Sequence, residues 1–437
     1  MLKRIIIIIS LFIILATGFV LRKNNYQFVP FPGESLDEYS NAWMGLSLIR
    51  LGVPVGISGL SGYSQSAPKY INVDRIFQGE ARGVPMAISY PWFDHPPLMG
   101  LVSGGFAYLQ HARIFEDATI NLIRKPMLVL GAITIFLVFW LALEIFDLKT
   151  ALVAAALYAT SPVVVVSSRM VQAENGMIVF ALMALILLKK WPKKVWMAGL
   201  VAGIGILFKL SGIFILIAGL FLGGGWQFII TTAIIASGFG IYGLVLDAKT
   251  FFNIFFSNVD RAYGIGFHAL YELFTSTKIT GTKFLTDGWP LVGWLGLSAA
   301  LANQEIKRYK WVVVPLLSYL AVYLLQGSEA YGWYRIPFMP FLFILAAALI
   351  TARSGMWLML IPLGVNLNKI ILWNQQGQYT GLWKWGIAGL VLLIIPAWFG
   401  KNSWWSKIIM FLLFISVLWS NIAYNNIITI DYWYKAF

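Results

Sequence analysis

Residues 127–146, MLVLGAITIFLVFWLALEIF, carry one charged side chain, that of Glu144. As a helix, this run is about long enough to cross the ~30 Å hydrocarbon layer of a membrane. Comparable apolar runs recur along the chain, separated by brief polar breaks. They lie at residues 2–21, 127–146, 151–166, 176–188, 195–208, 212–223, 228–246, 289–301, 311–325, 336–350, 357–372, 382–398 and 405–423. We therefore expect an all-α polytopic membrane protein with about thirteen transmembrane helices.

The composition supports this class. The 437 residues are 59% hydrophobic and 11% charged, with a mean hydropathy of +0.77, and so much apolar surface cannot be hidden in a water-soluble fold. The formal net charge of +14 comes from Lys and Arg spread over short loops, which favours membrane topology and anionic lipid over nucleic acid as its reason. The chain has no cysteine, which excludes a disulfide scaffold, a thiolate nucleophile and a Cys-ligated metal.

The short basic loops predict the orientation. Residues 2–21 could be a signal peptide or a first transmembrane helix, and the lack of an A-x-A-like cleavage site favours a retained helix. If the segments alternate, most basic loops fall on one face, which is then cytoplasmic. These loops contain Lys189, Lys190, Lys193, Lys194, Lys307, Arg308, Lys310, Arg353, Lys401 and Lys407, whereas Arg22 and Lys23 oppose the rule.

Two long stretches, about 24–124 and about 247–288, then lie outside the membrane. In the first of them, residues 39–51 and 97–111 alternate apolar and polar side chains, so we expect interfacial helices there. The second of these helices should start at Pro96 or Pro97, since proline is tolerated in a first helical turn.

Acidic residues occur at three places on this predicted outer side. They lie in GESLDEYSNAW (residues 33–43, with Glu34, Asp37 and Glu38), WFDHPPL (92–98) and SPVVVVSSRMVQAENGM (161–177). Each place alone is also explained by a helix N-terminus, a solvated loop or a polar turn. Together, on one side of the membrane, they could bind a cation or act as a base toward a hydroxyl group.

Four stretches in order resemble a known family. LDEYSNAWMGLSLIRLGVP (36–54), FDHPPL (93–98), residues 161–177 and GWYRIPFMPFLFILAAAL (332–349) are similar to signatures of the protein mannosyltransferase and lipid A aminoarabinose transferase superfamily. These are GT-C glycosyltransferases. The resemblance implies a membrane enzyme that moves a hexosyl or pentosyl group from a polyprenyl-phosphate donor to an acceptor on the outer face. It covers residues 1–350 as a catalytic module, whereas 351–437 carry no signature and form C-terminal helices of unknown role.

The resemblance also assigns roles to residues. Asp37 is the general base, with Glu38 as its companion and Glu174 as a further catalytic carboxylate. Asp94 and His95 match an acidic and basic pair that serves the donor phosphate, although this chain has His where the aminoarabinose transferases have Lys. The resemblance implies donor-phosphate binding by His95, Lys209, Arg335 and Arg169, with Asp94 and His268 supporting the site.

The chemistry of such a transfer requires these residue types. Displacing a polyprenyl phosphate from a sugar C1 needs a carboxylate to orient or deprotonate the nucleophile, and cations to neutralise the leaving phosphate. A single inverting displacement is our hypothesis. No P-loop, G-x-G-x-x-G after a strand or G-x-S-x-G occurs, which argues against an ATP or nucleotide-sugar site. We expect no dedicated metal centre and no certain cofactor, although His268 and Glu272 leave a divalent cation as an open alternative.

Two other classes of protein remain open. A lipid or sugar transporter or flippase would also be a basic polytopic bundle, but it is expected to carry ionisable residues near the membrane midplane. An assembly scaffold would need no acidic cluster. The expected partners are membrane lipids, a polyprenyl-phosphate sugar and a protein, lipid or glycan acceptor, with no nucleic acid. The sequence identifies neither the sugar nor the acceptor. We expect an integral protein of a prokaryotic plasma membrane with its active site on the outer face.

Overall fold

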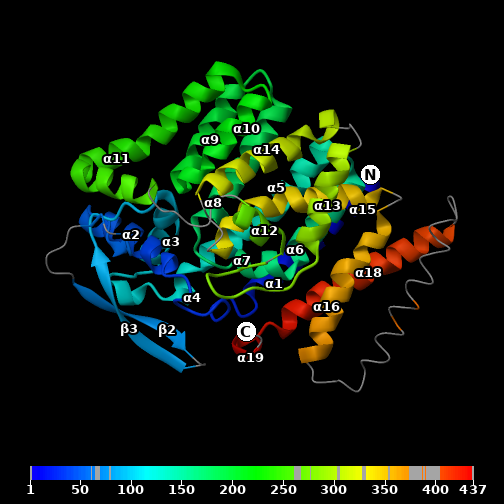
Figure 1. The fold of residues 1–437 in the computed structure, drawn as a ribbon, viewed down its shortest axis with the longest axis horizontal. Helices are drawn as coiled ribbons and strands as arrows, with labels where there is room; N and C mark the ends of the chain where they lie inside the picture. Colours follow the sequence, from blue (N-terminus) through cyan, green and yellow to red (C-terminus); the bar gives the residue numbers. More distant parts are fainter. Residues whose placement is uncertain are drawn as a thin grey trace.

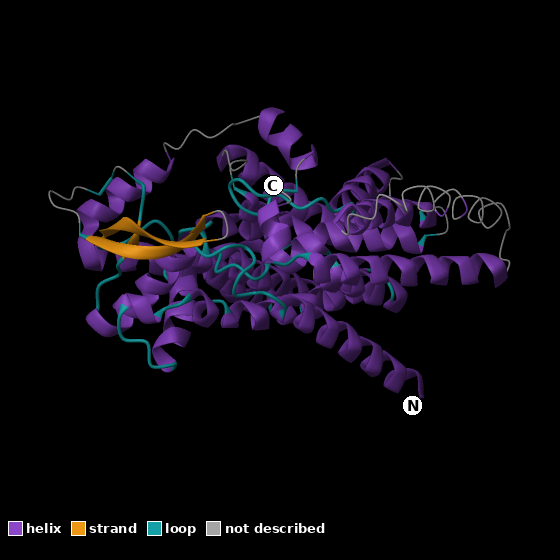
Figure 2. Ribbon diagram, turned by 90° about the horizontal axis from the view of Figure 1, so that it is seen from below, coloured by secondary structure: helices purple, strands orange, loops and turns teal. Residues whose placement is uncertain are grey.

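The protein is a helical bundle with a small sheet at one end (Figures 1 and 2). The computed structural model describes residues 2–60, 62–63, 69–77, 80–259, 267–275, 277–302, 306–326, 331–352, 355–373, 386, 389 and 404–435. The first part of the chain forms α1 (Leu2–Lys23), α2 (Asp37–Leu51), β1 (Gly56–Ile57), β2 (Tyr70–Phe77), β3 (Glu80–Ser89), α3 (Leu98–Leu109), η1 (Phe115–Asp117) and α4 (Ile120–Ile123). The bundle continues with α5 (Lys125–Ile145), α6 (Leu148–Thr160), α7 (Pro162–Ser167), α8 (Ala173–Lys190), α9 (Val195–Phe208), η2 (Leu210–Gly212), α10 (Ile213–Phe221), α11 (Gly225–Val259) and α12 (Phe267–Thr275). It ends with α13 (Trp289–Ala302), α14 (Ile306–Gln326), η3 (Gly332–Phe338), α15 (Met339–Thr351), η4 (Met356–Met359), α16 (Leu360–Trp373), α18 (Trp404–Ile427) and α19 (Ile430–Lys435).

The apolar runs form the predicted helices. Each predicted membrane segment falls on one or two helices, except 382–398, of which only residues 386 and 389 are described. Among the described residues, six helices are long and apolar enough to cross a membrane, so the chain is an integral membrane protein. They span Arg4–Lys23, Ile120–Ile145, Gly225–Asn258, Lys307–Leu325, Gly332–Thr351 and Lys407–Ile427. The count of about thirteen crossings stays a prediction.

One predicted segment, 151–166, is broken into α6 and α7 at Ser161. Ser161 has an extended ψ of 126°, and Pro162 starts the next helix, as expected because proline cannot continue a helix from its interior. The Ser161 hydroxyl donates a 2.6 Å hydrogen bond to the buried carboxylate of Asp287. The break therefore provides a donor for a carboxylate that would otherwise be costly to bury.

Close helix contacts in the bundle centre depend on small residues. α15 is almost wholly buried and packs against α6 and α13. A Cβ atom placed on Gly296 of α13 would lie 2.8 Å from the carbonyl oxygen of Leu345. The two backbones can approach this closely because glycine has no side chain.

The first outer stretch holds strands, and this corrects the expectation of an all-α chain. β1, β3 and β2 form a three-stranded antiparallel sheet in that order, with Val73 opposite Val84. The hairpin of β2 and β3 lies at the lower left margin of the molecule in Figure 1. Residues 70–77 pair with residues 80–87 across the hairpin, and a search for transmembrane helices does not detect such pairing between strands.

Helices α2 and α3 occupy the positions where interfacial helices were expected. They pack on each other so closely that a Cβ atom on Gly45 would lie 1.8 Å from the carbonyl oxygen of Gly100. Residues 38–47 of α2 are buried, so this helix packs inside the protein, and its placement at a membrane surface stays a prediction.

The C-terminal helices are tied to the rest of the bundle by buried polar groups. The Asn421 amide donates to the Thr160 hydroxyl at 3.0 Å, and Asn366 donates to the Asn421 side-chain oxygen at 2.6 Å. Beyond α18, the short helix α19 returns to Glu34, ahead of α2. The contacts of Asn421 with Thr160 and of Trp433 with Glu34 cross the predicted boundary at residue 350.

Candidate functional site

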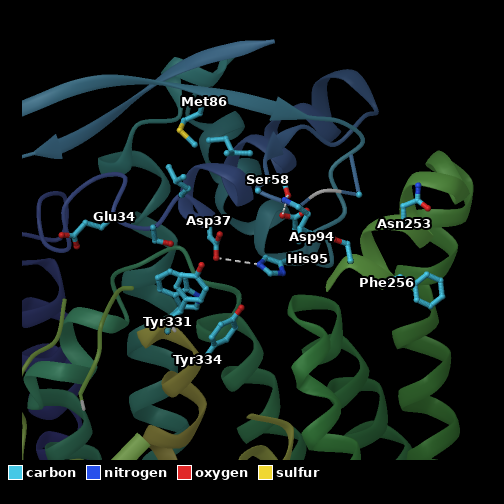
Figure 3. Close-up of a pocket in the computed structure, with 18 residues that line it drawn as sticks. Glu34, Asp37, Ser58, Met86, Asp94, His95, Asn253, Phe256, Tyr331 and Tyr334 are labelled. Atoms are coloured by element: carbon cyan, nitrogen blue, oxygen red, sulfur yellow. Dashed lines mark hydrogen bonds and ion pairs between the residues drawn. The ribbon is translucent and has the colours of Figure 1, made fainter. Parts of the chain in front are cut away.

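A cavity of about 900 Å³ lies between the first outer stretch and the ends of the bundle helices. Its walls come from residues 34–37, the loop after β1, residues 94–95, the end of α11 and residues 331–334. Figure 3 shows the labelled side chains of these segments around one common space. Two of the three acidic places named from the sequence therefore contribute to the same cavity.

Asp37 and His95 meet inside this cavity. His95 Nε2 lies 4.0 Å from Asp37 Oδ2, and 35% of the Asp37 side chain is exposed against 13% of that of His95. Asp37 is the first residue of α2, where the positive end of the helix dipole favours a carboxylate. The His95 ring stands edge-on to Trp92 with the ring centroids 5.7 Å apart. A substrate that enters the cavity can therefore reach a carboxylate and an imidazole at once.

Asp94 is held in place by two hydroxyl groups. Ser58 donates to one carboxylate oxygen at 2.6 Å, and Tyr63 donates to the other at 2.7 Å. Burial and the Asp94 charge raise the pKa of Tyr63 well above its usual range, so Tyr63 remains a hydroxyl donor. The helix after the double proline begins at Leu98, with Pro97 as its N-cap. Asp94 thus fixes the loop after β1 relative to the neighbouring His95, a contact that its sequence motif did not reveal.

Glu38 does not line the cavity, although it adjoins Asp37. It is fully buried, and Arg124 Nε and Nη2 donate to its carboxylate at 3.0, 3.0 and 2.7 Å. Arg124 Nη1 also donates to the carbonyl oxygens of Tyr26 and Pro30. The pair joins the start of α2 to the end of α4 and to the chain after α1.

Arg169 is also held away from the cavity lining. Its guanidinium donates to the backbone carbonyl oxygens of Arg22, Val29 and Leu21, and 1% of the residue is exposed. Burial first, and then the charges of Arg124 and Arg22, lower the pKa of Arg169 to about 9. The structure therefore places Arg169 as a clamp on the end of α1.

Glu174 and Lys209 form a buried ion pair directly behind the cavity wall. Lys209 Nζ also lies 4.1 Å from the ring centroid of Tyr334, which lines the cavity. Burial alone would lower the pKa of Lys209, but Glu174 reverses this, so that the pKa lies above its usual range. Lys209 therefore stays a cation, one aromatic ring away from the cavity.

The remaining predicted residues lie on the bundle side of the site. Arg335 is 2% exposed, and its Nη2 lies 3.7 Å from Glu272 Oε2. Lys278 Nζ lies 3.5 Å from the same oxygen. His268 lies in α12, and its side chain is outside the described part of the chain. Within the described residues, no three His, Cys, Asp or Glu side chains gather where they could hold a metal ion.

Glu34 lines the same cavity; the sequence placed it in the first acidic stretch, but the resemblance assigned it no role. Trp433 Nε1 of α19 donates to its two oxygens at 3.0 and 3.1 Å. Its place three residues before Asp37 was visible in the sequence. No sequence pattern indicated that a tryptophan near the C-terminus would contact it.

Comparison with known protein families agrees with the motifs. Residues 94–259 match the family model described as dolichyl-phosphate-mannose-protein mannosyltransferase. This range contains Asp94, His95, Arg169, Glu174 and Lys209. No curated protein matched the sequence.

Comparison with solved structures shows the fold. The chain is similar to ArnT from Cupriavidus metallidurans in the apo state, with a TM-score of 0.57 and 15% identity over 98% of this chain and 75% of that one. The same ArnT bound to undecaprenyl phosphate gives 0.54 and 13% over 96% and 75%. The archaeal oligosaccharyltransferase AglB from Archaeoglobus fulgidus, in complex with an inhibitory peptide and a dolichol-phosphate, gives 0.50 and 13% over 97% and 56%. The chain has the GT-C fold, and the resemblance stated from its four motifs is confirmed.

Proposed function

We propose that this chain is a glycosyltransferase that moves a sugar from a polyprenyl-phosphate donor to an acceptor in the cavity of Asp37 and His95. The observation that carries the proposal is the meeting of a carboxylate and an imidazole, 4.0 Å apart, in a cavity of about 900 Å³. A cavity of this size can hold a sugar and a phosphate. The similar ArnT and AglB structures with undecaprenyl phosphate and dolichol-phosphate support the choice of donor.

In this proposal Asp37 accepts the proton of the acceptor hydroxyl group. The acceptor oxygen forms a new bond to C1 of the sugar, while the bond between C1 and the phosphate oxygen breaks. The electron pair leaves with the polyprenyl phosphate, which is a stable anion and needs no general acid. General base catalysis of this kind contributes about 10²- to 10⁴-fold to a rate.

His95 binds the phosphate directly, and Lys209 adds positive potential through the wall at Tyr334. Charges in a site that excludes water act more strongly than the same charges in bulk water. Glu174 holds Lys209 in position. Glu38 and Arg169 do not line the cavity. Glu38 fixes the start of α2, which carries Asp37, and Arg169 fixes the end of α1.

The distribution of charge supports an active site on the outer face. α8 has 18 residues and is therefore about 27 Å long. It begins beside the cavity at Glu174 and ends at Lys189 and Lys190. Since basic loops favour the cytoplasmic side, the cavity lies at the opposite, outer side. We propose a prokaryotic plasma membrane as the location.

The test uses the purified chain in lipid nanodiscs with a panel of radiolabelled polyprenyl-phosphate hexoses and pentoses. Consumption of one donor with release of polyprenyl phosphate is the expected result. In a parallel assay the chain is placed in lipid vesicles. If it binds the donor without consuming it and moves the intact donor from one leaflet of the vesicle membrane to the other, the result would instead favour a flippase. A product that retains the anomeric configuration of the donor would contradict a single displacement.

A further inference from the structure

The cavity has two ends on either side of Asp37. In Figure 3, Asp37 lies between His95 on one side and Glu34 on the other. If the donor phosphate binds at His95, the nucleophile that Asp37 deprotonates must come from the side of Glu34. The Glu34 end is therefore the place to look for acceptor recognition.

Glu34 is a carboxylate with a fixed orientation. The Trp433 indole contacts both of its oxygens, and Trp433 itself is fully buried. Burial raises the pKa of Glu34 to about 7, against smaller opposing effects of Trp433, Lys283, Arg124 and the Phe31 backbone. A carboxylate has about four acceptor positions, so capacity remains for further donors after the bonds from one indole.

Aromatic rings line the same cavity. Tyr331 and Trp333 stack with their ring centroids 4.7 Å apart and an angle of 17° between the planes, and both line the cavity. Trp333 is 4% exposed, and among the described residues its buried Nε1 has no hydrogen-bond partner. Trp333 therefore supports the Tyr331 ring from behind, and Tyr331 is the more exposed ring of the pair.

Taken with the proposed glycosyl transfer, on which this step rests, we infer that the Glu34 end of the cavity is an acceptor subsite that binds the ring of a sugar, so that the acceptor is a glycan. The Glu34 carboxylate accepts hydrogen bonds from ring hydroxyl groups. The Tyr331 ring, stacked on Trp333, packs against the apolar face of the sugar ring. A Ser or Thr side chain offers one hydroxyl group, which Asp37 engages, whereas one sugar ring offers further hydroxyl groups to Glu34 on the same rigid frame. In this inference, the short helix α19 orients Glu34 through Trp433.

The test measures sugar binding without requiring turnover. The full chain in lipid nanodiscs is mixed with methyl α-D-mannopyranoside or methyl β-D-glucopyranoside, and binding is followed by saturation-transfer NMR. The variants are Glu34→Gln, which keeps the shape of the side chain, and Trp433→Phe, which removes the N–H group but keeps an aromatic ring. Glu116→Gln is the matched control, since Glu116 is exposed in η1 and does not line the cavity.

At a pH above 7, where Glu34 is ionised, we expect a glycoside to bind the unaltered chain and the Glu116→Gln control, and to bind about tenfold more weakly to Glu34→Gln, because a hydrogen bond to a charged group is lost. Trp433→Phe should weaken binding in the same direction. Undecaprenyl phosphate binding, measured on the same samples, should be unchanged in every variant and shows that each is folded.

Three results would overturn the inference. These are equal glycoside affinity in the unaltered chain and Glu34→Gln, an equal loss in the Glu116→Gln control, or binding of Ser and Thr peptides but of no glycoside. If the chain binds undecaprenyl phosphate but no glycoside, the result contradicts the acceptor subsite and still supports the proposed donor. If the chain binds neither, the result contradicts both the acceptor subsite and the proposed function.

Discussion

The Glu38–Arg124 pair gives a prediction whose magnitude follows from the structure. Both side chains are 1% exposed, and the pair has three nitrogen-to-oxygen contacts of 3.0 Å or less. Replacing Arg124 with Met leaves a buried carboxylate without its cation. Breaking a buried pair in this way costs about 3–5 kcal/mol of unfolding free energy. Replacing both residues with Met removes the uncompensated charge. The double variant should therefore lose less unfolding free energy than the two single variants lose together.

The assay is a denaturant titration in detergent micelles, arranged as a double-mutant cycle. It compares the unaltered chain, Glu38→Met, Arg124→Met and the double variant. We expect an interaction energy of about 2–3 kcal/mol between the two sites, at the high end for contacting residues. Glu38→Gln should lower stability and, through the start of α2, lower transfer by Asp37. Strict additivity would refute the structural role of the pair. A Glu38→Gln protein of unchanged stability that had lost transfer would assign Glu38 to catalysis instead.

Three further predictions concern the same region. His95→Ala should weaken undecaprenyl phosphate binding, because it removes the side chain proposed to contact the phosphate, whereas His95→Lys should keep a cation there and bind more tightly than His95→Ala; equal affinity of His95→Ala and the unaltered chain in a binding titration would contradict this. The Glu34 pKa, raised from 4.5 to about 7, means that the folded state holds a proton that the unfolded state releases between these values. The thermal midpoint of the unaltered chain should therefore fall from pH 5 to pH 7 more than that of Glu34→Gln, and parallel curves would contradict it. Gly45→Val should destabilise the chain in a thermal melt, because Gly100 leaves no room for a side chain, whereas Gly240→Ala, which meets nothing within 4 Å, should not.

The membrane helices could be predicted from the sequence because their physical signature is local. A run such as 127–146 is apolar whatever its neighbours are, and α5 occupies almost the predicted residues. The strands at 70–77 and 80–89 were missed because their stability depends on pairing with each other. The break at Ser161 was missed for a similar reason, since its partner Asp287 is distant in sequence.

The candidate site could be predicted in part. Asp37, Asp94 and His95 were named from motifs, and the structure brings them to one cavity. Burial separates Glu38 and Arg169 from that cavity, and a sequence motif cannot distinguish a buried ion pair from a catalytic pair. The contact of Trp433 with Glu34 joins the two ends of the chain, and such a contact follows only from the complete fold.

The central claim is that Asp37 is the base of a glycosyl transfer from a polyprenyl phosphate. The most direct test compares the unaltered chain, Asp37→Asn and the Glu116→Gln control in transfer of radiolabelled sugar, with undecaprenyl phosphate binding measured in parallel. We predict that Asp37→Asn binds the lipid phosphate normally and transfers sugar about 10²- to 10⁴-fold more slowly, while the control transfers at the rate of the unaltered chain. Transfer by Asp37→Asn at the unaltered rate would contradict the account.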